Sequence, residues 1–391
     1  MKRLGMGLVG PGFIAAHHID AVRRLGDVDI VAIAGSSQES ADRKSLELKA
    51  GRAYGNYLDL IHDSDVDVVH NTTPNHLHFP VSMAAIKAGK HVVSDKPLAV
   101  TPEEARELRE AALASGKPHV VMFNYRGNPV VQQARAMVQS GEVGVLNFIH
   151  GFYLQDWMAD AGIYSWRSDP SKGGVSSALG DIGSHWCDLA QHVSGTHIQS
   201  VLADLTTIVP VRYQEGPARP SFSPKQPAKG DGIPVQGEDL ASVLLRFEGG
   251  AKGCFSVGQV AAGHKNDLQL ELNGRSGSLR WQQEVPNDLW VGRYGEPNTI
   301  ITKDPAQLVA EASRYVSLPA GHQGGWADAF FNVMNDAYTW IRAGSAHVEK
   351  PSATATFDDG YRVCCIIDAM LRSHLCGGIW QPVSYVPISR H

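Results

Sequence analysis

A glycine-rich turn close to the N-terminus constrains the fold of this chain more than any other feature. The run Gly10-Pro11-Gly12-Phe13-Ile14-Ala15 follows a short apolar segment, Leu4 to Gly10, and precedes apolar residues at helical spacing. In a strand–turn–helix unit that binds a dinucleotide, the first glycine permits the tight turn and the second lets a pyrophosphate approach the helix N-terminus. The sequence therefore predicts a dinucleotide site that includes Gly10, Gly12, Phe13 and Ile14.

The rest of residues 1–123 continues the alternation of short apolar strands with amphipathic helices. Thr101-Pro102-Glu103-Glu104 combines an N-cap, a first-turn proline and a capping glutamate, which marks the start of one helix. Strands that alternate with helices predict a parallel sheet covered by helices, here a Rossmann domain over residues 1–123. After the first strand, the predicted strands cover residues 30–34, 66–70, 91–94 and 118–123.

A different pattern predicts a second, α+β domain over residues 124–391, so the fold class is α/β with two domains. Helices are expected over about 129–140, 325–342 and 358–374. Glycine turns separate segments of alternating apolar residues, which predicts antiparallel hairpins. These strands cover residues 241–247, 254–260, 268–273 and 278–281.

Composition limits the kind of partner. The chain has 391 residues and a net charge of −5, with no stretch dense in lysine and arginine, whereas a nucleic-acid partner needs a basic face. A small-molecule partner is therefore expected. Since no apolar run is long enough to cross a membrane and no signal-peptide cleavage pattern follows Met1, we expect a cytoplasmic protein. The proline-rich stretch from Pro210 to Pro234 predicts an exposed loop or, alternatively, a lid or an arm between subunits.

The end of the second strand bears on the choice of cofactor. Domains that bind NAD usually carry an acid there, which bonds the adenosine ribose, but the segment Ala34-Gly35-Ser36-Ser37 has none. Ser36, Ser37 and Arg43 could hold the 2′-phosphate of NADP. Alternatively, Ser36 and Glu39 form a capping box for the next helix. NAD and NADP both stay open, with a slight preference for NADP.

Two loops at the carboxyl ends of predicted parallel strands carry polar residues. Thr73-Pro74-Asn75 with His78 follows one strand, and Asp95-Lys96-Pro97 follows the next. Open α/β sheets place their ligands at these ends. A lysine there can polarise or protonate a substrate oxygen, which predicts a catalytic role for Lys96.

A second pair of candidate catalytic residues lies in the segment Gly180 to Asp188, where another helix is predicted. Asp181 and His185 are four residues apart, so their side chains are expected to share a helix face at about 5–6 Å. Histidine is the natural base for an alcohol proton, and a nearby carboxylate can orient it. No metal is predicted, because the segment has a single histidine and no further ligand at the right spacing.

Together these motifs resemble the glucose-fructose oxidoreductase / inositol dehydrogenase family, often called the Gfo/Idh/MocA family. The resemblance spans nearly the whole chain and implies a large open, mainly antiparallel sheet in the second domain. It also implies that Lys96 and His185 are catalytic and that Asp181 holds the substrate or the histidine. The implied cofactor contacts further include Thr73, Pro74, Asn75, His78, Asp95, Lys96, Asn124, Trp166 and Arg167.

One departure from the family pattern is Asp95, a shorter carboxylate where a glutamate is usual before Lys96. The Lys96-Pro97 bond is predicted to be cis on the strength of the resemblance. Aromatic faces suit the apolar side of a pyranose, although Trp157 could equally belong to the core. With Lys96, Asp181 and His185, the predicted substrate contacts are Arg126, Tyr153, Asp156, Trp157 and His322, the last near a helix expected to roof the pocket.

Three functions are consistent with these residues. The first is NAD(P)-dependent oxidation or reduction of a ring hydroxyl on a sugar, cyclitol or glycoside. The second is glycoside cleavage with a retained cofactor, through transient oxidation, elimination and re-reduction. The third is a nucleotide-sensing binding protein without turnover, which would have no need of an acid/base set. A homodimer or homotetramer is expected, because a partner subunit could cover the outer face of the second domain's sheet.

Overall fold

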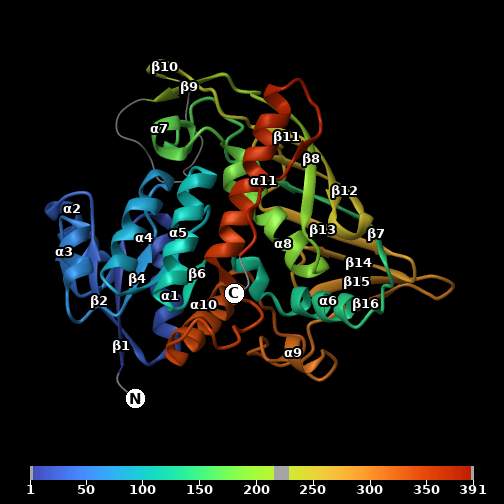
Figure 1. Cartoon of the computed structure of the whole chain (residues 1–391), viewed down its shortest axis with the longest axis horizontal. Coiled ribbons are helices and arrows are strands. Elements are labelled where there is room, and N and C mark those ends of the chain that lie inside the picture. The colour runs from blue at the N-terminus through green and yellow to red at the C-terminus, as the bar shows by residue number, and fades with distance from the viewer. Residues whose placement is uncertain (1–2, 215–228, 389–391) are drawn as a thin grey trace. The chain divides into compact units, whose positions relative to one another are not determined.

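The computed structural model describes residues 3–214 and 229–388, which Figure 1 shows as ribbons. Contacts divide the chain into two compact units. The first comprises Met1–Asn124, Ser171–Gly174 and Trp326–Tyr361, and the second comprises Tyr125–Pro170, Val175–Gly325 and Arg362–His391. The first unit therefore includes, besides the predicted residues 1–123, two segments from the part of the chain that was expected to form the second domain.

The first unit is built on a seven-stranded sheet in the order β17-β6-β5-β4-β1-β2-β3. The predicted Rossmann fold is confirmed, since β1 to β6 run parallel and the strand order reverses direction at β1. β17 adds one antiparallel strand at the β6 edge. The strands are β1 (Leu4–Val9), β2 (Val28–Ala34), β3 (Arg52–Tyr54), β4 (Val68–Asn71), β5 (His91–Ser94), β6 (His119–Val121) and β17 (Ala355–Thr356).

Right-handed crossovers place the helices that follow β1 and β2 on one face of this sheet and those that follow β4 and β5 on the other. Thr101 caps α5 as predicted, with its side chain accepting from the Glu104 amide. The cap of α2 is Ser37, not Ser36, because Ser37 has the extended backbone that a cap requires. The helices are α1 (Phe13–Leu25), α2 (Gln38–Leu48), α3 (Tyr57–His62), α4 (His78–Lys87), α5 (Pro102–Ser115) and α10 (Trp326–Ala343).

The second unit is built on a nine-stranded sheet in the order β16-β15-β14-β13-β7-β12-β11-β8-β18. The predicted mainly antiparallel sheet is confirmed, and only the pair β7 and β12 runs parallel. The strands are β7 (Leu146–Leu154), β8 (Ile198–Thr206), β11 (Leu240–Phe247), β12 (Lys252–Gly258), β13 (Asp267–Gly274), β14 (Gly277–Gln282), β15 (Asp288–Arg293), β16 (Thr299–Thr302) and β18 (Gln381–Pro382).

Helices α6 (Pro129–Gln139) and α8 (Ser184–Ser194) pack on one face of this sheet (Figure 1). Trp186 of α8 stacks on Phe255 of β12 with the ring centroids 4.4 Å apart, which fixes the helix on the sheet. The remaining helices are α7 (Pro170–Gly173), α9 (Ala310–Ser313) and α11 (Phe357–Leu375). Within the described ranges, no helix has the length and apolar character needed to cross a membrane.

The proline-rich stretch differs from the predicted loop. Its two ends form an antiparallel pair, β9 (Val211–Gln214) with β10 (Asp231–Pro234), and residues 215–228 between them lie outside the described residues. Buried Arg212 on β9 donates to Asp239 Oδ1 at 2.7 Å and to the Met158 carbonyl at 2.8 Å. The strand pair is therefore tied to the second unit by an ion pair that the sequence pattern does not reveal.

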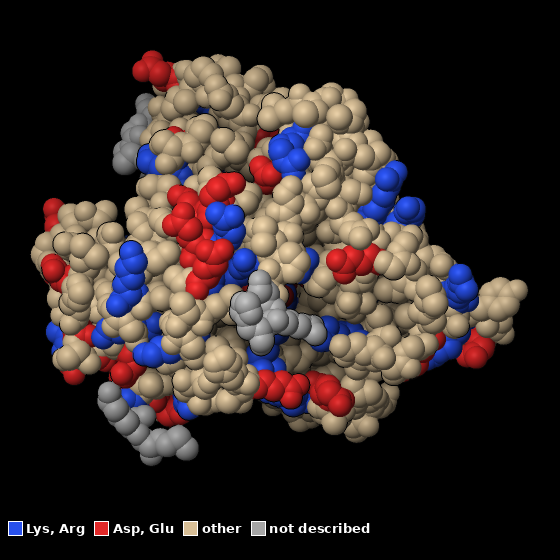
Figure 2. Space-filling view, in the orientation of Figure 1, with Lys and Arg blue, Asp and Glu red and all other residues tan. Residues whose placement is uncertain are grey.

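Charges on the face shown in Figure 2 are mixed, with lysines and arginines interspersed among acidic residues. Glu103, Glu107 and Glu110 are exposed on α5. This pattern agrees with the modest net charge of −5.

Candidate active site

The turn between β1 and α1 has the shape that a pyrophosphate needs. Gly10 has a φ of +88°, and a methyl group on it would lie 2.7 Å from the Thr73 backbone, so only glycine fits there. A methyl group on Gly12 would meet only the Gly10 carbonyl, at 4.0 Å. Gly12 caps α1, whose first turn carries no acidic residue. The amides at this helix end can therefore receive an anionic group, as the glycine motif predicts.

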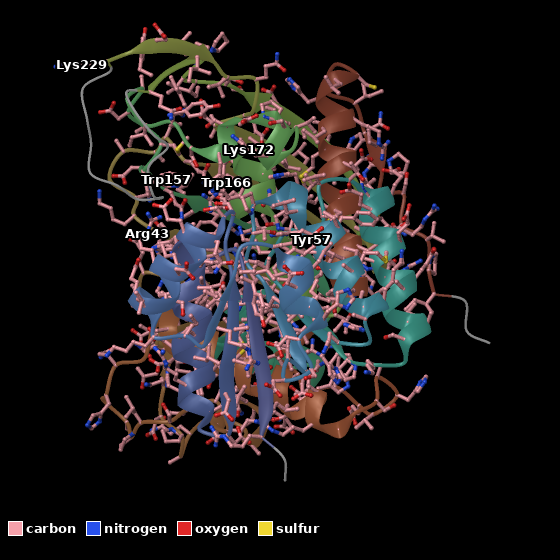
Figure 3. The ribbon with its side chains drawn as sticks, turned by 90° about the vertical axis from the view of Figure 1, so that its left-hand side faces the viewer. Arg43, Tyr57, Trp157, Trp166, Lys172 and Lys229 are labelled. Atoms are coloured by element: carbon pink, nitrogen blue, oxygen red, sulfur yellow. The ribbon has the colours of Figure 1, made fainter. Side chains whose placement is uncertain are left out.

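The tip of β2 lacks an acid for a packing reason. A methyl group on Gly35 would lie 2.9 Å from the Ala41 amide nitrogen in α2, so a larger side chain would push against the helix. Ser36 and Ser37 are exposed beyond this point, and the Ser37 hydroxyl accepts from the Ser40 amide at 3.2 Å. Arg43 is also exposed on α2 (Figure 3). The polar groups predicted to hold a 2′-phosphate thus belong to one helix N-terminus and its first turns.

Asn71, the last residue of β4, organises the loop that contains Thr73, Pro74 and Asn75. Its amide donates to the His78 carbonyl and to the Ser82 hydroxyl, both at 3.0 Å, while its Oδ1 accepts from the Thr73 hydroxyl at 2.7 Å. Because β4 pairs with β1 and β5, this loop lies beside the loops that follow those strands. Asn71 is not among the site residues predicted from the sequence.

His78 connects the two loops rather than offering its ring to a ligand. The side chain is buried, with Nε2 at 2.9 Å from the Thr73 carbonyl oxygen and Nδ1 at 2.6 Å from the Pro97 carbonyl oxygen. Burial lowers the pKa of His78. Since both ring nitrogens face backbone oxygens, this geometry favours a supporting role over the predicted cofactor contact.

Lys96 stands on the loop that follows β5. Its backbone amide donates to Asp95 Oδ1 at 2.9 Å, and the predicted cis Lys96-Pro97 bond is confirmed. The shorter carboxylate at position 95 therefore fixes the lysine backbone. The segment Ser171–Gly174 joins this edge of the first unit, because Asn75 Nδ2 donates to the Gly173 carbonyl at 2.9 Å. Neighbouring Lys172 is exposed (Figure 3), and sequence reasoning did not associate it with the nucleotide-binding unit.

Asn124, at the end of the first unit, offers a test of the predicted cofactor contact. The side chain is buried, and among the described residues no hydrogen-bond partner is found for its amide nitrogen. Buried donors without a partner are rare in native proteins, because they cost about 1–3 kcal/mol. This donor fits a bound group that carries an acceptor, such as a nicotinamide carboxamide.

In the second unit, Asp181 and His185 lie on adjoining helical segments. Asp181 belongs to a π-helical turn, Leu179–Gly183, and His185 is the second residue of α8. Buried Glu238 anchors the start of this region, since its Oε1 accepts from the Ser177 and Leu179 amides, both at 2.8 Å. A carboxylate suits the positive end of a helix, and here it comes from a distant part of the chain.

Asp181 has side-chain partners other than the predicted histidine. Its Oδ2 lies 3.1 Å from Arg167 Nε and 2.8 Å from Gln259 Nε2. The Arg167 guanidinium also lies 4.5 Å from the ring centre of Trp166 and 5.8 Å from that of Trp157 (Figure 3). The π-helical turn removes the regular α-helical face on which the Asp181–His185 spacing was predicted, so contact between these two side chains stays a prediction.

His185 is buried between aromatic rings. The Tyr125 ring meets it edge-on, with centroids 5.1 Å apart and planes at 71°, and the Tyr153 ring centre lies at 6.3 Å. These rings limit how the imidazole can turn. Burial raises the pKa of the Tyr153 hydroxyl well above its usual value, so Tyr153 stays neutral.

The other predicted substrate contacts have different surroundings. Arg126 is buried and forms a two-point ion pair with Asp188 of α8, with Nε 2.8 Å from Oδ2, so its geometry favours support of the helix over substrate contact. Asp156 pairs with Lys265 at 2.5 Å. His322 is exposed in the loop before α10, whose bounds, Trp326–Ala343, agree with the helix predicted over 325–342.

Sequence reasoning missed four polar residues around this part of the second unit. Three carry amides and one a phenol: Gln155, Gln259, Asn266 and Tyr125. No local signal marks them, because none belongs to a motif and their partners lie far away in the sequence. Tyr125 differs from the others in lying between Asn124 and Arg126, which were predicted site residues.

The fold and the pyrophosphate-compatible turn define the class of protein as a dinucleotide-binding Rossmann protein. Residues 4–125 match the model of the oxidoreductase family with an NAD-binding Rossmann fold, and residues 131–280 match the GFO/IDH/MocA C-terminal domain. The chain therefore belongs to the GFO/IDH/MocA oxidoreductase family, which confirms the predicted resemblance.

Relatives with a named activity match the chain along almost its whole length. Levoglucosan dehydrogenase of Pseudarthrobacter phenanthrenivorans is 31% identical over 95% of this chain and 96% of its own. A solved levoglucosan dehydrogenase in complex with NADH and levoglucosan superposes with a TM-score of 0.86 at 29% identity, covering 98% of this chain and all of the other. An inositol dehydrogenase homologue of Azotobacter vinelandii, complexed with NAD+, gives 0.83 at 27% identity and covers 97% of each chain.

Proposed function

We propose that this enzyme oxidises or reduces a ring hydroxyl of a sugar, cyclitol or glycoside by hydride transfer. The observation that carries the proposal is a buried histidine, His185, held between two tyrosine rings in the unit that also contains the Asp181–Arg167 ion pair. Oxidation of an alcohol needs a base for the hydroxyl proton, and a histidine is suited to that task near neutral pH. The named sugar and cyclitol dehydrogenases among the relatives support the substrate class.

We assign the roles of three residues in this reaction. His185 takes the hydroxyl proton, and the Lys96 ammonium stabilises the negative charge that develops on the oxygen. Asp181, whose Oδ2 is bound by Arg167 and Gln259, holds the substrate or the histidine. When bound, the nicotinamide supplies the two-electron acceptor for the carbon-bound hydrogen. Gly10, Gly12 and the α1 amides would hold the pyrophosphate.

A screen of sugars, cyclitols and glycosides, with nicotinamide absorbance and product identity followed together, tests this function. Net formation of reduced cofactor with an equal amount of a keto product is the expected result. Cleavage of a glycoside without net reduced cofactor would replace the proposal with the redox-neutral glycosidase reaction. Tight cofactor binding without conversion of any substrate would instead support the nucleotide sensor.

For the cofactor, we predict that NADP binds at least as tightly as NAD. The exposed groups beyond β2 are hydroxyls and the Arg43 guanidinium, which suit a phosphate better than a ribose hydroxyl. Arg43→Ala should weaken NADP by about tenfold, as expected for one charge-assisted hydrogen bond, and leave NAD unchanged. Isothermal titration calorimetry with both cofactors measures this.

Lys44→Ala is the matched control, since Lys44 is next in the helix but pairs with Glu47 at 2.8 Å. A clearly tighter affinity for NAD in the unmodified protein would contradict the prediction. Gly35→Asp is not a clean test of this choice, because an aspartate there would press against the Ala41 backbone.

For assembly, we predict a homodimer or homotetramer that covers the open face of the large sheet. Strand register aligns one row of side chains across this face, with Leu244 49% and Ile300 61% exposed. An open apolar and charged face of this kind suits a symmetric partner. The row comprises Leu202, Leu244, Cys254, His150, Glu271, Arg280, Trp290 and Ile300.

Light scattering at micromolar concentration measures the assembly. Leu244→Arg should shift the protein toward monomer, because it places a charge on β11 within the covered face. Leu46→Arg, at an exposed position on α2, should leave the assembly unchanged. A monomer in the unmodified protein would refute the prediction.

A further inference from the structure

Three side chains of the second unit form a closed ring of hydrogen bonds. The Tyr125 and Tyr153 hydroxyl oxygens lie 2.6 Å apart, and the Tyr153 hydroxyl donates to Asn266 Oδ1 at 2.6 Å. Asn266 Nδ2 donates back to the Tyr125 hydroxyl at 3.1 Å. Both tyrosines are buried, whereas Asn266 is half-buried.

The protons of this ring can be counted. Asn266 donates to Tyr125, and Tyr153 donates to Asn266, so the hydrogen bond between the two hydroxyls must use the Tyr125 proton. Each member then donates once around the ring, an arrangement in which the bonds reinforce one another. Both hydroxyl protons are therefore engaged within the ring.

A chain of amides connects the ring to Asp181. A carboxylate only accepts, so Gln259 must turn its Nε2 toward Asp181, at 2.8 Å. The same Nε2 lies 3.4 Å from Gln155 Oε1, and Gln155 in turn donates to Asn266 Oδ1 at 2.9 Å. The charge of Asp181 thus sets the orientation of Gln259. Gln155 Oε1 accepts from Gln259 and, at 3.0 Å, from the Trp157 indole, which turns the Gln155 Nε2 toward Asn266.

The tyrosine rings held in this way are the same rings that flank His185, at 5.1 Å and 6.3 Å between centroids. A hydroxyl proton that is engaged in the ring cannot also be given to a substrate. In this arrangement the two tyrosines therefore cannot act as proton donors. They act on His185 through the contact of their rings with its imidazole.

We propose that Asn266 is a positioning residue, which fixes the Tyr125 and Tyr153 rings and through them the imidazole of His185. The role of this imidazole as the base rests on the proposed function. Asn266 itself needs no contact with the reacting atoms.

A double-mutant cycle with Asn266→Ala and Tyr153→Phe tests this proposal. Asn266→Ala should lower kcat by about tenfold, the effect of one lost buried hydrogen bond, with the KM of substrate and the Kd of cofactor changed less than about twofold. Tyr153→Phe keeps the ring and loses the hydroxyl. The double variant should be no slower than Asn266→Ala alone, because both substitutions break the same closed ring of hydrogen bonds.

Asn287→Ala is the matched control. Asn287 is a half-buried asparagine of the same unit, which donates to Gln323 Oε1 at 2.8 Å and to the Gly324 carbonyl at 3.0 Å, outside the ring. Its replacement should leave kcat unchanged. The proposal would be overturned if Asn287→Ala lost as much kcat as Asn266→Ala. It would also be overturned if Asn266→Ala raised KM without changing kcat, or if the double variant were slower by the product of the two single effects.

A second readout does not depend on turnover. In Asn266→Ala the NMR signal of the His185 Cε1–H should broaden or split, because the imidazole samples more than one orientation, while it stays single and sharp in Asn287→Ala. An unchanged signal in Asn266→Ala overturns the positioning role. If no sugar or cyclitol is converted by the unmodified enzyme, the proposed function fails, and the NMR result still decides whether Asn266 positions His185.

Discussion

Replacing His185 with alanine, or Lys96 with methionine, should lower turnover by about 10²–10⁴-fold, the usual contribution of a positioned acid or base. His185→Ala removes the proposed base for the hydroxyl proton. Lys96→Met keeps the length of the side chain and removes the charge proposed to stabilise the alkoxide. Steady-state kinetics on the substrate found by the screen gives kcat for both variants.

Cofactor affinity separates this effect from a general loss of structure. The Kd of the cofactor should change far less than kcat in both variants, since the proposed phosphate site is the Gly10 and Gly12 turn, elsewhere in the chain. His374→Ala, a partly exposed histidine on α11 of the same unit as His185, should retain full turnover. Near-normal turnover in both His185→Ala and Lys96→Met would show that the assigned site is wrong.

Lowering the pH from 7 to 5 should reduce the free energy of unfolding by about 4 kcal/mol through two buried histidines alone. Burial lowers the pKa of His18 to about 4 and that of His119 to about 3. In the unfolded chain both titrate near 6.5. The folded state therefore binds fewer protons, so this stability is present above pH 6.5 and is lost as the pH falls.

The surroundings of these two histidines explain why their pKa values are lowered. His18 Nδ1 lies 2.9 Å from Nδ1 of buried His70, and such a pair cannot carry two charges. His119 Nδ1 accepts from the Val92 amide at 3.2 Å, and this bond requires the neutral ring. For both histidines, desolvation and specific contacts together favour the neutral ring.

Denaturant unfolding at pH 7, 6 and 5 measures the effect. His119→Gln removes one titrating group, so the loss between pH 7 and 5 should become smaller by about 2 kcal/mol, whatever the variant's stability at pH 7. His347→Gln, at an exposed position of the same unit, should keep the full pH dependence. An equal loss in His119→Gln and in the unmodified protein would contradict the assignment.

The fold was largely predictable because the information that specifies it is local. The β1 turn, the strand at His91–Ser94 and the Thr101 cap follow from residues within one or two turns of each other. The cap of α2 was predicted at Ser36, one residue before the observed cap, Ser37, and this error is also local. Two adjacent serines both suit a cap, and only the backbone conformation selects between them.

The candidate site was predictable only in part. Motifs indicated Lys96, Asp181 and His185, but the partners of Asp181 and the rings around His185 belong to no motif. Arg126 illustrates the opposite error. It was predicted to contact the substrate, but its side chain is buried in an ion pair with Asp188, 62 residues away.

The sequence by itself determined the classes of element, the nucleotide turn and the family, because helix periodicity, strand alternation and turn chemistry act between near neighbours. Only the tertiary structure decided which polar groups meet. Gln259 reaches Asp181 across 78 residues and Asn266 reaches Tyr125 across 141. Because β7 pairs with β12 on one side and β13 on the other, Gln259 also lies beside Gln155, and Asn266 beside Tyr153. Alternation along a strand does not specify its neighbours, since pairing depends on the packing of the whole sheet.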